Sequence, residues 1–185
     1  MAGQVIWITG LSGAGKSTVS EELCLRFRER GLRPVLLDGE ILRNLFKNTK
    51  APNDTYNREA RIQLALKYAH LCEILSSQGF TVVIATVSMF REIYAWNRAN
   101  FPNYFEVYLK VPLDELRLRD PKKIYQRYDA GDLSDVAGLD LSVDEPLEPH
   151  VILDFETHPF LWDSPANITE HLMLKLEKER FKANL

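Results

Sequence analysis

Short apolar runs alternate with stretches of helical periodicity along the whole chain. Continuous apolar runs are typical of strands that are buried on both faces, and they occur at residues 5–9, 34–38, 80–86, 105–111 and 150–154. Apolar residues at helical spacing predict helices over residues 16–30, 41–46, 57–78, 90–100 and 167–182, with a further helix opened by Pro112. This alternation predicts an α/β fold of one domain over residues 1–185, in which helices flank a mainly parallel five-stranded sheet in three layers.

The segment that joins the first predicted strand to the first predicted helix carries a phosphate-binding motif. Residues 10–17 read Gly-Leu-Ser-Gly-Ala-Gly-Lys-Ser and match the pattern G-x-x-x-x-G-K-[ST] at every fixed position. In such a loop, backbone N–H groups surround phosphate oxygens, Lys16 supplies a cation for the β- and γ-phosphates, and the Ser17 hydroxyl ligates Mg²⁺. A turn that only caps a helix would not need strand, loop, Lys-Ser and helix in this order. We therefore expect a P-loop NTPase fold that binds a nucleoside triphosphate and Mg²⁺.

The composition is that of a soluble globular protein, with 185 residues of which 45% are hydrophobic and 26% are charged. A formal net charge of −3 argues against a protein that coats nucleic acid, because such proteins carry a basic face. No apolar run approaches the length of a membrane span and no apolar leader precedes the first strand, so we expect a cytoplasmic protein without a membrane contact. Cys24 and Cys72 lie in helical patterns without metal-ligand spacing, which predicts two reduced, buried thiols.

Acidic residues follow the second predicted strand, at the sheet edge where parallel α/β folds bind their ligands. Asp38 and Glu40 come first, and Arg43 lies one helical turn further on. One interpretation is that the two acids cap and charge the N-terminus of a helix. The other is that one carboxylate orders the waters of Mg²⁺ while the other takes the proton of an acceptor hydroxyl, since both roles need an acid near the transferred phosphoryl group.

Three further positions suit an anionic acceptor. Ser88 follows the third predicted strand together with Arg91 and no acid, and a hydroxyl beside a cation suits an anion better than a metal. Alone, Ser88 also fits the cap of the next helix. Arg58 and Arg61 open the longest predicted helix, where they either bind the acceptor or lie on the surface.

Cations and tyrosines gather around Asp120 and Pro121, at Arg117, Arg119, Lys122, Lys123, Tyr125, Arg127 and Tyr128. Such a run is either a solvated helix face or a lid that brings cations onto phosphates and excludes water. We place the predicted lid at about residues 117–149, which include a long irregular segment at 132–149.

Taken together, these motifs resemble those of the adenylyl-sulfate kinase family over about residues 5–154. The resemblance rests on the phosphate loop at 10–18, on Leu-Leu-Asp-Gly-Glu at 36–40 followed by Arg43, on Val-Ser-Met-Phe-Arg at 87–91, and on the strand and lid from 105 to Tyr125. It implies an enzyme that transfers the γ-phosphate of ATP to the 3′-hydroxyl of adenosine 5′-phosphosulfate, in a family that often forms homodimers.

The resemblance also implies a set of site residues. The expected catalytic residues are Lys16, Asp38, Glu40 and Ser88, and the expected metal ligand is Ser17. The expected ATP-binding residues are Gly10, Ser12, Gly13, Ala14, Gly15, Lys16, Ser17, Thr18, Arg119, Lys122 and Tyr125. The expected acceptor-binding residues are Asp38, Arg43, Arg58, Arg61, Val87 and Ser88.

Departures from the family pattern fall at positions that recognise the acceptor. The family's D-R-x-x-N-I-R reads Asn-Arg-Glu-Ala-Arg-Ile-Gln at 57–63, its F-T-G-I-D begins with Val136, and its lid glycine is Lys123. An aromatic ring that stacks on the acceptor base is thereby lost, and such stacking is worth about 1–3 kcal/mol. We therefore expect adenosine phosphosulfate to bind poorly.

The chain also resembles a branch of the family that works in capsular polysaccharide pathways, the cytidine diphosphoramidate kinases. This likeness includes residues 85–90, 92–98 and 103–108. The favoured prediction is a kinase of cytidine diphosphoramidate, with adenylyl-sulfate kinase as the alternative. A GTPase-type switch would need an N-K-x-D element, which the chain lacks, and a fold that binds ATP without transferring it is disfavoured by the retained Lys16, Ser17, Asp38 and Ser88.

Overall fold

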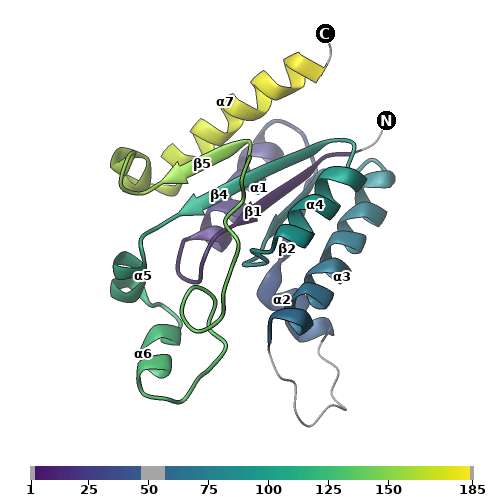
Figure 1. Ribbon diagram of the computed structural model, residues 1–185. Helices are drawn as coiled ribbons and strands as arrows, with labels where there is room; N and C mark the ends of the chain where they lie inside the picture. Colours follow the sequence, from purple (N-terminus) through teal and green to yellow (C-terminus); the bar gives the residue numbers. More distant parts are fainter. Residues whose placement is uncertain (1–2, 47–56, 184–185) are drawn as a thin grey trace.

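Five strands form one fully parallel sheet in the order β2-β3-β1-β4-β5 (Figure 1). They are β1 (Val5–Thr9), β2 (Val35–Asp38), β3 (Val82–Ala85), β4 (Tyr104–Lys110) and β5 (Val151–Asp154). The computed structural model describes residues 3–46 and 57–183, so the loop expected at 47–55 lies outside the described residues. The predicted α/β fold with a five-stranded sheet is confirmed.

Helices cover both faces of the sheet, and two short helices lie beyond the carboxyl ends of its strands (Figure 1). Their bounds are α1 (Lys16–Glu29), α2 (Gly39–Phe46), α3 (Arg58–Ser77), α4 (Arg91–Asn100), α5 (Leu113–Arg119), α6 (Ile124–Asp129), the 3₁₀ helix η1 (Pro159–Asp163) and α7 (Pro165–Ala183). Helices α1 and α7 pack together on one face, and α3 and α4 pack together on the other. Helix α6 and the last residues of α5 lie within residues 117–149, where the sequence predicts a lid.

The central strand shows why the strands read as continuous apolar runs. Ile6 and Ile8 pack into the core shared with α1 and α7, whereas Val5 and Trp7 pack into the core shared with α3 and α4. All four side chains are 0% exposed. A strand that is covered on both faces favours apolar residues at successive positions, so the alternation seen in half-exposed strands is absent.

Side-chain caps account for helix starts that differ from the predicted ones. Both carboxylate oxygens of Asp120 accept backbone N–H groups in the first turn of α6, from Ile124 and Gln126, although the N-cap residue itself is Lys123. A helix at this place is one of the two interpretations that the charged run allowed. Helix α7 begins two residues earlier than predicted because the Ser164 hydroxyl accepts the backbone N–H of Asn167. Capping of this kind satisfies N–H groups that have no partner within the helix.

Two sequence expectations concern residues away from the sheet edge. Cys24 and Cys72 are both buried and free, as predicted. Within residues 3–46 and 57–183, no helix combines the length and apolar character that a bilayer span requires.

A buried acid lies on β4. Glu106 is 0% exposed, and its Oε2 accepts a hydrogen bond from Arg98 at 2.5 Å. Its Oε1 has no partner in the described part of the chain, and neither do Trp7 Nε1 and Asn97 Oδ1. Burial raises the pKa of Glu106 to about 7, although the Arg98 guanidinium opposes the shift.

Replacing Glu106 with Gln tests this buried charge. Between pH 4.5 and about 7, folded Glu106 holds a proton that the unfolded chain has released, so this group makes the free energy of unfolding fall as the pH rises through this window. A shift of this size corresponds to about 3 kcal/mol. Urea denaturation below, within and above the window should show a steeper fall for the wild type than for Glu106→Gln. Parallel pH profiles would mean that Glu106 titrates normally.

Candidate active site

The phosphate loop leaves β1 and enters α1 through glycines that no other residue replaces easily. Gly15 has a φ of 87°, in the left-handed region, where it forms the N-cap of α1. A side chain at Gly10 would place its Cβ 2.6 Å from the carbonyl oxygen of Leu109. Lys16 folds back over the loop, with Nζ donating to the carbonyl oxygen of Leu11 at 2.7 Å. The loop therefore has the close-packed form that presents backbone N–H groups to phosphate.

Lys16 is held in an environment that disfavours its charge. Burial, and to a smaller extent the nearby Lys122, lower the pKa of Lys16 to about 7, while Asp38 acts in the opposite direction. An anion that enters beside Lys16 would remove this destabilisation. The site thus favours ligands with several negative charges.

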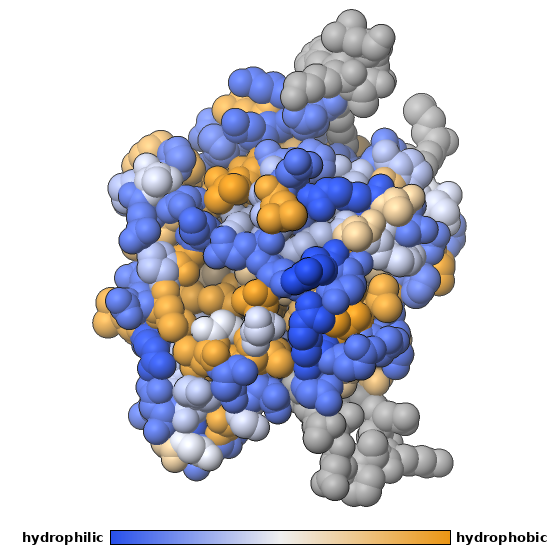
Figure 2. Space-filling model, viewed as in Figure 1, coloured by the Kyte–Doolittle hydropathy of each residue, from blue (hydrophilic) through white to orange (hydrophobic). Residues whose placement is uncertain are grey.

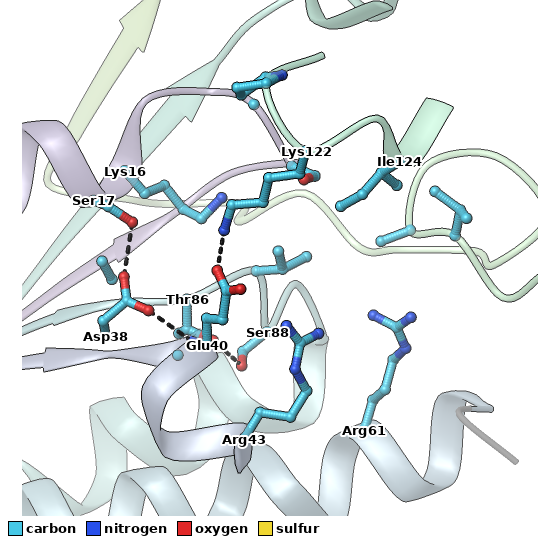
Figure 3. A pocket seen from close by; sticks show the side chains of 18 of the residues that line it. Lys16, Ser17, Asp38, Glu40, Arg43, Arg61, Thr86, Ser88, Lys122 and Ile124 are labelled. Carbon is cyan, nitrogen blue, oxygen red and sulfur yellow. Dashed lines mark hydrogen bonds and ion pairs between the residues drawn. The ribbon is translucent and has the colours of Figure 1, made fainter. Parts of the chain in front are cut away.

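Asp38 joins the phosphate loop to the end of β2. Its Oδ2 accepts the Ser17 hydroxyl at 2.7 Å, and its Oδ1 accepts the backbone N–H groups of Glu40 at 2.8 Å and Ile41 at 3.4 Å (Figure 3). The bonds from Glu40 and Ile41 are those of a helix cap, as the first interpretation predicts, and the bond from Ser17 brings the same carboxylate to the phosphate loop. It caps α2, which begins at Gly39 rather than at Ile41 for this reason, and it reaches the loop.

The same carboxylate fits a magnesium site. Partial burial raises the pKa of Asp38, but the hydrogen bonds from Ser17, Glu40 and Ile41 outweigh it and hold the pKa below its ordinary value. No group of three or more His, Cys, Asp or Glu side chains among the described residues could hold a metal ion. Mg²⁺ is commonly bound by one or two protein oxygens together with substrate phosphates, and the Ser17 hydroxyl and Asp38 carboxylate fit that pattern.

A cavity of about 610 Å³ opens beside the loop, between the ends of β2 and β3 and the lid region. In Figure 2, hydrophobic side chains gather in the hollow between the α5–α6 side and the α3 side of the molecule. Among the predicted site residues, the cavity is lined by Ser12, Gly13, Gly15, Lys16, Ser17, Thr18, Asp38, Glu40, Arg43, Arg61, Val87, Ser88, Arg119 and Lys122. Gly10, Ala14, Arg58 and Tyr125 do not line it.

The end of the cavity away from the loop is cationic and rich in hydroxyls. Arg43 from α2 and Arg61 from α3 extend toward it (Figure 3). The hydroxyls of Thr86 and Ser88 share a buried hydrogen bond of 2.8 Å. Ser88 does not cap α4, whose N-cap is Phe90 and makes no side-chain cap bond, so its hydroxyl serves the cavity wall instead.

Arg58 does not line the cavity. Its guanidinium donates to both carboxylate oxygens of Glu92, at 2.9 and 3.1 Å, and to Asp144 at 2.7 Å. Its Cζ also lies 5.2 Å from the centroid of the Phe90 ring. These partners hold Arg58 behind the cavity wall, and Arg61 is the cation of α3 that reaches the cavity.

Only part of the predicted lid cluster faces the cavity. Arg119 and Lys122 line it, and Lys122 forms an ion pair with Glu40 that links the lid to α2 (Figure 3). Tyr125 is 1% exposed, and its hydroxyl donates to the carbonyl oxygen of Ser12 at 2.9 Å. Tyr125 therefore supports the phosphate loop from behind rather than facing the cavity.

Sequence reasoning missed several wall residues, namely Leu64, Tyr68, Thr86, Leu133, Ser134, Asp135 and Ala137. Asp135 is the most constrained of them, with a positive φ of 56°. Its backbone N–H donates to Asp140, and its carbonyl oxygen accepts from Arg61. Asp140 lies close enough in sequence to suggest a side-chain turn, but no local signal connects Asp135 with Arg61.

A sequence model described as adenylylsulphate kinase matches residues 2–154. The chain belongs to this family. The cytidine diphosphoramidate kinase of Campylobacter jejuni is 36% identical over 142 residues, which cover 77% of this chain and 81% of that protein. The adenylyl-sulfate kinase of Gloeothece citriformis is 35% identical over 150 residues, covering 80% of this chain and 82% of that protein.

Solved structures of the adenylylsulphate kinase family have the same fold. The Mycobacterium tuberculosis APS kinase CysC in complex with AMPPNP and APS superposes with a TM-score of 0.82 at 26% identity, covering 95% of this chain and 98% of that one. As a member of the family, the protein is an ATP-dependent phosphotransferase. ATP is the phosphate donor that this family uses.

The lowered pKa of Lys16 predicts that ATP binding takes up a proton above pH 7. Above pH 7, Lys16 is largely neutral in the protein without ATP, whereas the phosphates of bound ATP favour its charged form. Calorimetry without acceptor, in buffers of different ionisation enthalpy, should show this uptake for the wild type. The uptake should shrink in Lys122→Met, because Lys122 no longer lowers the pKa of Lys16. Lys123→Met, which alters a neighbouring lysine outside the cavity lining, is the matched control. Equal uptake in all three proteins would contradict the assignment.

Proposed function

We propose that this kinase transfers the γ-phosphate of ATP to the 3′-hydroxyl of a nucleotide-linked small molecule, with cytidine diphosphoramidate as the favoured acceptor. The observation that carries the proposal is a cavity with the phosphate loop at one end. The other end is lined by arginines and hydroxyl groups, and its wall carries an aliphatic side chain at Val136. Adenylyl sulfate is the second candidate, because the adenylyl-sulfate kinase of Gloeothece citriformis is 35% identical to this chain, nearly as similar as the cytidine diphosphoramidate kinase at 36%.

On the donor side, the chain's own residues hold the phosphates. Backbone N–H groups of the loop bind phosphate oxygens, and Lys16 turns from the Leu11 carbonyl to the β- and γ-phosphates. The Ser17 hydroxyl, with Asp38 beside it, would hold Mg²⁺, which would supply neutralisation of the charge on the transferred group. Arg119 and Lys122 approach from the lid and exclude water.

On the acceptor side, Asp38 orients the hydroxyl and receives its proton. A carboxylate with a lowered pKa is a weak base, so its main contribution is positioning, which suits a loose phosphoryl transition state that needs little deprotonation. Arg43 and Arg61 bind the anionic groups of the acceptor, and Ser88 donates a hydrogen bond to them. Glu40 remains the alternative base.

The wall at 133–137 supports a pyrimidine acceptor. Val136 is 5% exposed and offers aliphatic contact where an aromatic ring would stack on a base. Asp135 beside it supplies a carboxylate, a group that accepts hydrogen bonds from the amino group of cytosine. The 36% identity to the cytidine diphosphoramidate kinase agrees with this choice.

Comparison of acceptors tests the proposal directly. ADP release should be stimulated strongly by cytidine diphosphoramidate and weakly by adenylyl sulfate, each measured as kcat/KM at saturating ATP. Stimulation by adenylyl sulfate alone would overturn the choice of acceptor but not the kinase assignment. No stimulation by either compound would overturn the proposed acceptor class.

Val136→Phe tests the wall residue. A ring at this position should restore base stacking, worth about 1–3 kcal/mol, and raise kcat/KM for adenylyl sulfate about tenfold or more relative to the cytidine compound. The KM for ATP is the internal control and should stay unchanged, because Val136 lies in the acceptor wall. An unaltered ratio between the two acceptors would show that Val136 does not select the base.

Asp38→Asn tests the proton acceptor. Loss of the carboxylate should lower kcat by about 10²–10⁴-fold, the usual contribution of a general base, with a smaller loss of ATP affinity. Glu40→Gln is the paired variant and should lower kcat less. A larger loss in Glu40→Gln than in Asp38→Asn would transfer the role to Glu40.

A further inference from the structure

Asp144 connects three parts of the fold through its carboxylate and its backbone. It lies in the segment 132–149, between α6 and β5. Its carboxylate accepts hydrogen bonds from Arg58 of α3 at 2.7 Å, and from the backbone N–H and the guanidinium of Arg91 at 3.1 and 3.3 Å. Its carbonyl oxygen accepts the hydroxyl of Tyr94, on α4, at 3.1 Å. Asp144 does not line the cavity, so an effect on a bound ligand has to pass through the elements that it holds.

Helix α4 takes its N-terminal cap from this distant segment. Its N-cap residue Phe90 makes no side-chain cap bond, and the first N–H groups of a helix have no partner within it. The Asp144 carboxylate accepts the N–H of Arg91, the first residue of α4, and places a negative charge where the helix dipole favours one. Partial burial raises the pKa of Asp144, but the hydrogen bonds from Arg91 and Arg58 outweigh it and keep the pKa below its ordinary value. An ionised Asp144 therefore holds the start of α4.

The turn that leads into α4 carries Ser88. Ser88 and Phe90 line the cavity, whereas Met89 between them does not. The carbonyl oxygen of Met89 accepts the backbone N–H of Asp144 at 2.9 Å. Together with the bond from Arg91, this attaches Asp144 to both neighbours of the cavity residue Phe90.

The segment that contains Asp144 also carries the wall residue Val136. Asp140 accepts the backbone N–H groups of Asp135 and Val136, at 2.8 and 2.7 Å. The backbone N–H of Leu141 donates to the carbonyl oxygen of Val136 at 3.2 Å, which closes a compact turn. Asp144 follows Leu141 by three residues. One residue thus ties the wall to the turn before α4.

We propose that Asp144 is a positioning residue for the acceptor, because it holds the turn that carries Ser88 against the segment that carries Val136 without touching either substrate. The inference rests on the proposed function, since it takes this end of the cavity as the acceptor's, but it needs no particular acceptor. Donor binding should be independent of Asp144, because the phosphate loop and Lys16 lie at the other end of the cavity.

The experiment compares Asp144→Asn and Asp144→Ala with the wild type. Asn keeps an oxygen for the N–H of Arg91 but loses the charge that pairs with Arg58, and Ala loses both. Glu92→Gln is the matched control, because it also removes a carboxylate partner of Arg58 while Asp144 stays in place. If Asp144→Ala does not fold, the comparison of Asp144→Asn with Glu92→Gln decides the question.

Three measurements are made on each full-length protein. Steady-state kinetics with cytidine diphosphoramidate and with adenylyl sulfate give kcat and the KM values of acceptor and ATP. Calorimetry without acceptor gives the affinity for ADP. Thermal unfolding shows whether the variant is folded at the assay temperature.

We expect Asp144→Ala to raise the KM of the acceptor that the wild type uses by about tenfold or more, since a displacement of about 1 Å can cost about 10²-fold. Asp144→Asn should raise it less. The loss should appear mainly in KM, because the groups at the transferred phosphate are untouched. The KM of ATP and the affinity for ADP should match the wild type, a split that a general loss of stability would not produce. Glu92→Gln should match the wild type in both KM values.

An unchanged acceptor KM in the Asp144 variants would overturn the inference and leave the proposed function intact. A parallel loss for ATP and acceptor would also overturn it, since the whole site would then be disturbed. An equal rise in Glu92→Gln would assign the effect to Arg58 rather than to Asp144. If the wild type turned over neither acceptor, the proposed function would fail, and this inference with it.

Discussion

The central position of β1 in the sheet decides where every part of the site lies. β1 runs between β3 and β4, so the loop that follows it is flanked on one side by the ends of β3 and β2 and on the other by those of β4 and β5. Asp38 and Ser88, which we propose bind the acceptor, come from the first side, and the predicted lid comes from the second. Since parallel strands end at one edge, the proposed function places the acceptor on one side of the transferred group and the donor on the other.

The phosphate loop and the strand and helix beside it were predictable, because neighbouring residues in the sequence specify them. The pattern at 10–17 contains the glycines, Lys16 and Ser17 in the order in which they act, and the apolar runs on both sides indicate strand and helix. Asp38 was open to two interpretations, a cap and a site residue. The structure shows the cap, and the same carboxylate has enough lone pairs to accept a hydrogen bond from Ser17 of the loop as well.

Arg58 shows what local sequence does not contain. Its partners Glu92 and Asp144 lie 34 and 86 residues further along the chain, and nothing near Arg58 indicates them. Asp144 also accepts the backbone N–H of Arg91, so one acid connects α3, α4 and the segment that forms the cavity wall. Such convergence is set by tertiary packing, and a resemblance between motifs does not reveal it.

The predicted lid also contains a contact that the local sequence does not reveal. Its cations were expected to face the phosphates together with Tyr125, yet the ring of Tyr125 is buried against the loop from behind. Its partner Ser12 is 113 residues away. In the first turn of helix α6, two backbone N–H groups donate to Asp120, and a run dominated by charge hides that signal.

The ion pair between Lys122 and Glu40 has a consequence for how the lid responds to its surroundings. Both side chains are about half exposed, at 50% and 46%, so water and dissolved ions weaken their attraction. A polyphosphate that enters the cavity competes with Glu40 for the same ammonium group. The ion pair between Lys122 and Glu40 is therefore exchangeable. A bound polyphosphate would replace the Glu40 carboxylate as the counter-ion of Lys122.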